Sequence, residues 1–256
     1  MSKIPNAFKS GKAFLAFLTA GDPNLDKTEE YILAMANAGA DLVEIGIPFS
    51  DPVAEGEVIT AANVRALAAG AKLPRIFDMV RAVRKNTDVP LVFLTYLNPV
   101  FKYGYEKFFA ACESSGMDGV IIPDLPYEEK GELTGIAALH GIDVVTLIAP
   151  TSSERVRTLA SGAHGFVYLV SSMGVTGVRK QISTDISSIV REIRQATQTP
   201  VAVGFGISEP TQAALIAREA DGVIVGSAIV KIIEKHGENA ADALTEYVAA
   251  MKSAIK

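Results

Sequence analysis

The feature that most constrains the fold of this chain is a regular alternation of short apolar runs with amphipathic stretches. The runs are rich in Val, Ile and Leu, and a segment with helical spacing follows each of them. Nearly continuous apolar strands indicate a parallel sheet that is covered on both faces, and strand–helix alternation indicates βαβ units. The runs occupy residues 13–21, 41–48, 90–99, 118–126, 143–151, 165–174, 200–208 and 221–229.

The number of these units favours a closed barrel. Eight βα units are what a (β/α)8 TIM barrel requires, and 256 residues match the usual length of that fold. The main alternative is an open, doubly wound sheet, which usually has fewer strands and a G-x-G-x-x-G turn after the first strand. The first strand here ends in TAGDP, which does not match. We therefore expect an α/β chain that forms a TIM barrel as a single domain over residues 1–256.

Composition and charge argue against several classes of protein. The net charge is −5 and no long basic run occurs, so the electrostatic signature of a nucleic-acid binder is missing. No apolar run approaches the roughly 18 residues of a membrane helix, and the first residues contain no apolar signal core. Cys112 is the single cysteine and lies in an apolar helical context, which predicts a buried thiol and fits a reducing cytoplasm. The histidines are scattered, so we expect no metal site.

Glu44 is the one carboxylate inside an apolar strand. Side chains alternate along a strand, so Glu44 shares the barrel-interior face with Leu42 and Gly46, while the intervening residues face the helices. A carboxylate in that interior loses hydration, and its pKa should rise. Such a group can give and take protons at neutral pH. It can equally be a structural carboxylate held by a cation or by backbone amides, and the residues alone leave both interpretations open.

The ends of the predicted strands carry polar residues and glycines. In such barrels the carboxyl ends of the strands form the catalytic mouth. Three glycine-rich turns, at 174–177, 204–208 and 226–230, follow neighbouring strands. Gly226 and Ser227 open a helix, where free backbone N–H groups bind phosphate well. These turns predict a phosphate site.

Seven motifs together resemble the tryptophan synthase alpha subunit family, from one end of the chain to the other. They are AFLTAGDP, EIGIPFSDP, YLNPVF, PDLP, SSMGVTG, GFGIS and GSAIVKIIE. The resemblance implies a lyase that cleaves indole-3-glycerol phosphate to indole and glyceraldehyde 3-phosphate in L-tryptophan biosynthesis. It also implies no cofactor in this chain and an alpha2beta2 tetramer with a beta subunit, which holds pyridoxal phosphate and receives the indole.

The resemblance assigns roles to individual residues. Glu44 matches the general acid/base, and Glu55 matches the carboxylate that accepts a hydrogen bond from the indole N–H. The implied substrate-binding residues are Phe17, Ile59, Leu94, Tyr96, Tyr168 and Thr176. The implied phosphate-binding residues are Gly177, Gly206, Gly226 and Ser227. The implied partner-facing residues are Pro48, Asp51, Pro52 and Asn98, although Asp51 and Pro52 also fit a plain turn.

Two residues depart from the family's pattern. Glu55 stands where the family usually has Asp, and Glu57 stands where it usually has Pro. We interpret Glu55 as a tolerated variant, and we expect Glu57 to loosen the loop because it restores φ freedom. Three alternatives stay open: a lyase that releases indole without a partner, a binding subunit that mainly activates a beta partner, and a barrel acting on another phosphorylated substrate.

Overall fold

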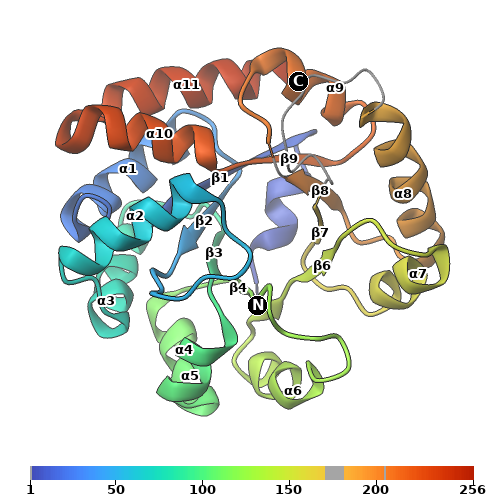
Figure 1. Cartoon of the computed structure of the whole chain (residues 1–256), viewed down its shortest axis with the longest axis horizontal. Helices are drawn as coiled ribbons and strands as arrows, with labels where there is room; N and C mark the ends of the chain where they lie inside the picture. The colour runs from blue at the N-terminus through green and yellow to red at the C-terminus, as the bar shows by residue number, and fades with distance from the viewer. Residues whose placement is uncertain (1, 171–181, 205) are drawn as a thin grey trace.

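The computed structural model describes residues 2–170, 182–204 and 206–256, and within them nine parallel strands form one sheet (Figure 1). The strand order is β5-β4-β3-β2-β1-β9-β8-β7-β6. The strands are β1 Ala13–Thr19, β2 Leu42–Gly46, β3 Leu91–Leu94, β4 Gly119–Ile121, β5 Asp143–Val144, β6 Thr146–Ile148, β7 Val167–Val170, β8 Val201–Gly204 and β9 Gly222–Val225.

The two strands at the ends of this order are halves of one barrel strand. β5 and β6 are separated by Val145 alone, whose N–H still donates to the Val120 carbonyl at 2.9 Å. β5 pairs with β4 and β6 pairs with β7, so the sheet returns on itself. The sheet therefore has eight strand positions, which confirms the predicted TIM barrel and excludes the open, doubly wound sheet.

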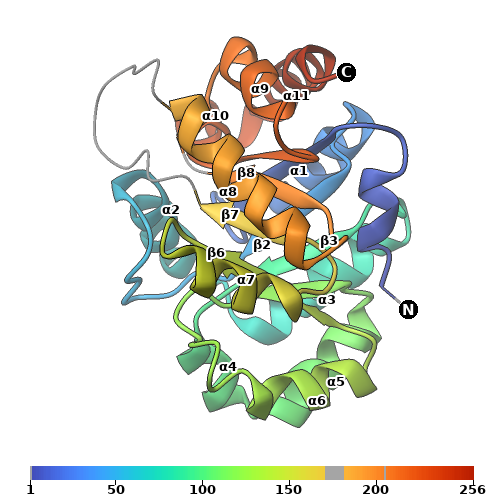
Figure 2. The same ribbon diagram turned by 90° about the vertical axis from the view of Figure 1, so that its right-hand side faces the viewer.

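Helices surround the barrel on its outside (Figures 1 and 2). The α-helices are α1 Leu25–Asn37, α2 Glu57–Ala68, α3 Leu73–Arg84, α4 Leu97–Tyr103, α5 Tyr105–Ser115, α6 Gly131–Leu139, α7 Ser153–Ser161, α8 Ile182–Ala196, α9 Pro210–Ala217, α10 Ser227–His236 and α11 Ala241–Ala254. Two short 3-10 helices are η1 Ile4–Phe8 and η2 Gly237–Asn239.

The segment after β3 differs from the sequence-based expectation. The strand predicted over 90–99 ends at Leu94, and Asn98 lies in the short helix α4. The first N–H of that helix, on Leu97, donates to Asp124 Oδ1 at 2.8 Å. Asp124 follows β4 and is distant from the helix in sequence. The local sequence pattern around residues 97–103 therefore does not reveal the hydrogen bond that begins α4.

The core has an inner and an outer layer, as expected for a barrel. Val43, Ile45 and Ile47 belong to the outer layer between strands and helices, with the buried thiol of Cys112. The inner layer contains Leu42, which confirms the predicted faces of β2. Its buried members are Ile4, Ala7, Ala13, Leu15, Leu42, Val92, Ile121, Val145, Phe166, Ala202 and Ile224. The barrel interior is thus a packed core rather than a pore.

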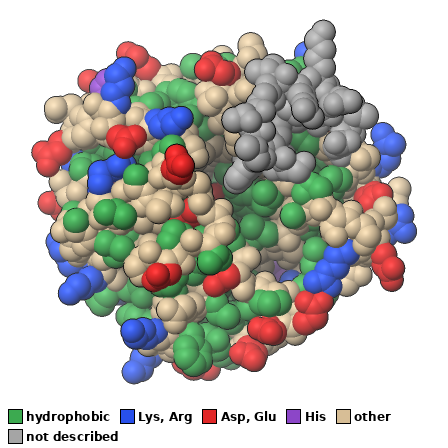
Figure 3. Space-filling view, in the orientation of Figure 1, with side chains coloured by type: hydrophobic (Ala, Val, Ile, Leu, Met, Phe, Trp, Pro, Cys, Tyr) green, Lys and Arg blue, Asp and Glu red, His purple; other side chains and the backbone are tan. Residues whose placement is uncertain are grey.

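The two ends of the barrel are differently built. Ile4 and Ala7 of η1 pack into the inner layer and close the amino ends of the strands. η1 lies across the barrel from the start of α2 (Figure 2). Hydrophobic side chains gather near the middle of the face shown in Figure 3. No helix in the described part of the chain is long and apolar enough to cross a membrane.

Candidate active site

Glu44 lies inside the barrel with its whole side chain buried. It is 0% exposed, and neither carboxylate oxygen has a hydrogen-bond partner among the described residues. The hydroxyl of Thr19, at the end of β1, is buried in the same unpartnered way. Burial raises the pKa of Glu44 to about 8, as the sequence predicted in direction. The interpretation as a carboxylate held by a cation or by amides therefore finds no support in the described residues.

Two aromatic rings lie close to Glu44 over glycines of neighbouring strands. Phe17 is paired with Glu44 in the register of β1 and β2, and its ring covers Gly46, where a Cβ would approach it within 2.8 Å. Tyr168 of β7 covers Gly204, where a Cβ would meet its hydroxyl at 2.6 Å. The pKa of Tyr168 is well above its usual value because of burial and the negative charge of Glu44. The two glycines leave room for the rings at this end of the barrel.

Three of the predicted substrate-binding residues, all apolar, lie in one cluster. Phe17 is buried in it, and Ile59 and Leu94 pack against it, half-buried. The sequence analysis missed the other members, Val58, Ala62 and Val230. They come from α2 and α10, where apolar residues at helical spacing are expected anyway, so no sequence signal distinguished them. Phe17 and Glu44 are paired in the register of β1 and β2, so their side chains lie on the same face of the sheet. The cluster therefore forms an apolar surface on the face that carries Glu44.

Glu55 lies in the loop between β2 and α2 and is half-buried. Its Oε2 accepts a hydrogen bond from Asn63 Nδ2 at 2.6 Å. Burial raises its pKa, while Asn63 and the Tyr96 hydroxyl act in the opposite direction because they favour the charged form. Tyr96 is itself buried, and its hydroxyl accepts from Ala54 N at 3.0 Å. The sequence analysis did not single out Asn63.

Glu57 is the first residue of α2 and is exposed. Proline is well tolerated at that first position, and a carboxylate there interacts favourably with the helix dipole. The exchange of Pro for Glu therefore replaces one residue that suits a helix start by another. Whether it loosens the loop stays a prediction.

The predicted phosphate-binding residues follow β8 and β9, which are paired neighbours. Gly206 is exposed just after β8, and Gly226 precedes α10, whose first residue is the exposed Ser227. Helix α10 has ten residues, so its first N–H groups form a real helix N-terminus. Thr176 and Gly177 lie outside the described residues.

The predicted partner-facing residues have mixed exposure. Pro48 is buried, Pro52 is half-buried, and Asp51 and Asn98 are exposed. Two large apolar side chains near them are exposed as well, Val53 at 79% and Phe101 at 67%. Exposed apolar side chains of this size, from the loop before α2 and from α4, are typical of a contact surface.

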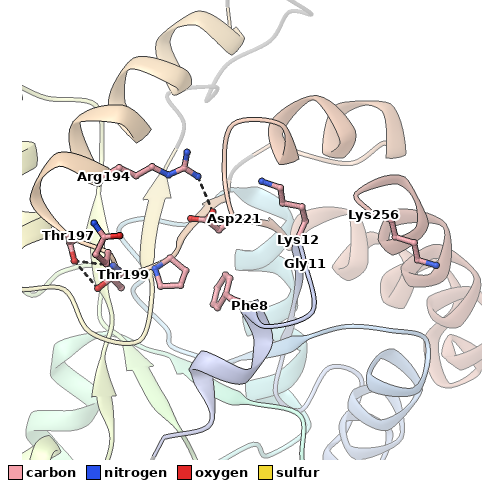
Figure 4. Close-up of a pocket in the computed structure, with 10 residues that line it drawn as sticks. Phe8, Gly11, Lys12, Arg194, Thr197, Thr199, Asp221 and Lys256 are labelled. Atoms are coloured by element: carbon pink, nitrogen blue, oxygen red, sulfur yellow. Dashed lines mark hydrogen bonds and ion pairs between the residues drawn. The ribbon is translucent and has the colours of Figure 1, made fainter.

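A separate pocket of about 580 Å³ opens at the other end of the barrel (Figure 4). Three of its four charged side chains already have partners: Arg194 Nη2 lies 3.0 Å from Asp221 Oδ1, and Lys12 Nζ donates to the Ala220 carbonyl at 2.7 Å, while Lys256 also lines the pocket. None of the residues at the carboxyl ends of the strands lines it. Among the described residues, no group of three His, Cys, Asp or Glu side chains is placed to hold a metal ion.

Comparison with known proteins identifies the same family as the sequence motifs. The family model for the tryptophan synthase alpha chain matches residues 6–256. The tryptophan synthase alpha chain of Lactiplantibacillus plantarum is 50% identical, with 100% of this chain and 97% of the relative covered. That of Lacticaseibacillus casei is 48% identical, with 100% and 96% covered.

Solved structures agree with these matches. Tryptophan synthase subunit alpha from Legionella pneumophila superposes with a TM-score of 0.91 at 34% identity, covering 100% of this chain and 98% of the other. A chain from a study of the tryptophan synthase a2b2 complex of Pyrococcus furiosus gives a TM-score of 0.88 at 39% identity, with 95% and 99% covered.

Proposed function

Because this chain belongs to the tryptophan synthase alpha chain family, we propose that Glu44 and Glu55 together carry out the cleavage of indole-3-glycerol phosphate. The family's reaction is a retro-aldol cleavage to indole and glyceraldehyde 3-phosphate in tryptophan synthesis, which makes the chain a lyase subunit. The reaction needs a proton at indole C3, stabilisation of the ring N–H as positive charge develops, and loss of a proton from a glycerol hydroxyl.

Glu44 serves as the proton shuttle. With a pKa of about 8 it carries a proton at neutral pH. It gives that proton to indole C3, and as the C–C bond breaks the carboxylate takes the proton of the glycerol hydroxyl, so protons balance. The single observation that carries the proposal is this buried carboxyl, which has no partner among the residues that the structure describes, because buried polar groups are otherwise almost always hydrogen-bonded.

The remaining residues bind and orient the substrate. Glu55, whose charged form is favoured by the hydrogen bonds from Asn63 and Tyr96 although burial raises its pKa, accepts the hydrogen bond of the indole N–H. The cluster around Phe17 receives the indole ring, and Tyr168 lies beside the reacting carbon. Gly206, Gly226 and Ser227 bind the phosphate through backbone N–H groups, together with Gly177. Thr176 is assigned to a lid that excludes water during the reaction.

We also propose a beta subunit as the partner, in an alpha2beta2 tetramer located in the cytoplasm. Support comes from the study of the a2b2 complex to which the Pyrococcus furiosus chain belongs, and from the exposed Val53 and Phe101 beside Asp51, Pro52 and Asn98. The buried Pro48 shapes this loop from within. The partner holds pyridoxal phosphate and receives the indole, while acid–base cleavage needs no cofactor in this chain.

The test is indole release from indole-3-glycerol phosphate, with and without a beta subunit. Glu44→Gln should lower kcat by at least about 100-fold, because general acid–base catalysis contributes about that much. The exposed Glu57→Gln is the matched control and should leave kcat unchanged. A wild-type chain that releases no indole in either condition, yet activates the partner, would favour the binding-subunit alternative. Full activity without the partner would favour the autonomous lyase.

A further inference from the structure

Asn63 is a buried amide that contacts the Glu55 carboxylate. It lies on α2, eight residues after Glu55, and is 3% exposed. The hydrogen bond from Nδ2 to Oε2 measures 2.6 Å, which is short for an N–H donor. The contact ties the loop before α2 back to the body of that helix.

The position of Asn63 in α2 makes this contact informative. The other buried residues of the helix are Ala62 and Ala66, so this face packs closely against the barrel. Asn is a weak helix former, and a buried amide without partners costs free energy. An apolar side chain would pack here without that cost, so the amide is explained by the carboxylate that it holds.

A second group holds the same loop from another side. The Tyr96 hydroxyl accepts from Ala54 N at 3.0 Å, and the Tyr96 ring packs against Phe49 with centroids 5.5 Å apart. The residue before Glu55 is thus fixed by the segment after β3, while Asn63 holds the carboxylate itself. Two separate elements therefore define where this carboxylate lies.

We propose that Asn63 is a positioning residue for the Glu55 carboxylate, an inference that rests on the proposed role of Glu55 in binding the indole N–H. A carboxylate offers about four acceptor sites, and Asn63 and the Tyr96 hydroxyl occupy two of them. The others remain available for the substrate. Glu has one more rotatable bond than Asp, and the hydrogen bond from Asn63 removes that freedom before the substrate binds.

The test is a double-mutant cycle on indole release with the full-length chain. Asn63→Leu keeps the approximate volume and removes the donor, and should lower kcat/KM about 10-fold, within the range for residues in direct contact. In a Glu55→Gln background the same change should alter kcat/KM less than about 2-fold, since Asn63 acts through Glu55. Val64→Ala, at the exposed neighbouring position of α2, is the matched control and should have no effect.

The dependence of kcat/KM on pH is a further test, because a role of Asn63 in packing alone would leave that dependence unchanged. Without Asn63 the charged form of Glu55 loses a donor, so the acidic limb of kcat/KM should move to higher pH in Asn63→Leu. Asn63→Asp should move it further, because a second carboxylate then faces Glu55. The substrate phosphate also titrates near pH 6, but it is common to all variants.

The two hypotheses fail in different ways. An inactive wild type, or an active Glu44→Gln, would overturn the proposed function and the role of Asn63 with it. If wild type is active but Asn63→Leu lowers kcat/KM equally in both backgrounds, with an unmoved acidic limb, only the positioning role is overturned.

Discussion

Glu44 shows a conflict between stability and function within a single residue. Its pKa of about 8 in the folded chain lies above the ordinary value of 4.5, so the folded state holds the proton more tightly than the unfolded state. Stability therefore falls as pH rises through the window from 4.5 to 8, and below 4.5 the effect is absent. Glu44→Gln removes this titration, because an amide stays neutral at every pH.

We predict that the stability of Glu44→Gln relative to wild type rises between pH 4.5 and 8. The expected gain is on the order of 3 to 5 kcal/mol, from the size of the pKa shift. Urea unfolding of both proteins at several pH values measures it. Glu57→Gln, at an exposed site, should show no such trend. If the difference in unfolding free energy between the two proteins stays constant with pH, burial does not disfavour the charged form of Glu44.

The rate of indole release should have a bell-shaped dependence on pH. Glu44 must begin with its proton, so kcat/KM should fall as pH rises past about 8. Glu55 must be charged, and burial raises its pKa, so the acidic limb should lie above the ordinary value for a glutamate. Steady-state measurements across the pH range give both limbs. A rate that keeps rising through pH 8 would instead make Glu44 a base from the start.

Glu55→Asp tests whether the longer side chain suits this site. Removing one methylene withdraws the carboxylate by roughly 1.5 Å, the length of a C–C bond. The Asn63 amide, now 2.6 Å from Oε2, would lose its partner, so we expect kcat/KM to fall several-fold. Indole release by the purified variant measures this. A faster variant would show that Glu55 costs rate in this chain and that the family's usual Asp is the better length.

At the scale of elements, a buried ion pair joins three segments around the mouth of the barrel. Asp22 follows β1 and is 2% exposed, and both its oxygens accept from Arg65 of α2 at 2.9 Å. Arg65 also contacts Glu234 of α10 at 3.0 Å. Helices α2 and α10, which supply apolar cluster residues, are therefore tied to the β1 end by one guanidinium.

We predict that the Arg65–Asp22 ion pair contributes more to the free energy of unfolding than the Arg65–Glu234 ion pair. Arg65→Ala leaves Asp22 buried without its cation and should cost about 3 kcal/mol of unfolding free energy. Glu234→Ala removes a half-exposed partner and should cost no more than about 1 kcal/mol. Denaturant unfolding of the two variants compares them directly. Equal effects would mean that burial of Asp22 does not decide the contribution of the pair.

The sequence predicted the architecture better than the details of its connections. Strand–helix alternation was sufficient for the barrel, and the period of two along β2 was sufficient for the inward face of Glu44. Helix α4 was missed because Asp124, which accepts its first N–H, is 27 residues away in the chain. Asn63 was missed because a lone Asn on a helix resembles a solvated side chain until its distant partner is known.

At the scale of the whole molecule, the amino end of the barrel repeats one stabilising arrangement. An Asp stands just before a strand, accepts from a backbone N–H near the start of the preceding neighbour, and contacts a cation. The hydrogen bonds run from Phe14 N to Asp41 at 2.7 Å, from Leu91 N to Asp118 at 2.9 Å and from Val201 N to Asp221 at 2.9 Å. The cations are Lys252, Arg84 and Arg194. These carboxylates fix the strands, whereas Glu44 at the other end has no hydrogen-bond partner within residues 2–170, 182–204 and 206–256.

Stability and catalysis should therefore separate between the two ends. Asp118 is buried and also accepts from Lys3 N at 2.8 Å, so Asp118→Ala removes the carboxylate partner of Arg84 and leaves two backbone donors, Lys3 N and Leu91 N, without their acceptor. We expect it to cost about 3 to 5 kcal/mol of stability, with kcat for indole release unchanged while the protein stays folded. Asp88→Ala, at an exposed partner of Lys3, is the control and should leave the unfolding midpoint unchanged. A large fall in kcat for folded Asp118→Ala would show that the amino end is coupled to the active site. Stability and catalysis would then not be separated between the two ends of the barrel.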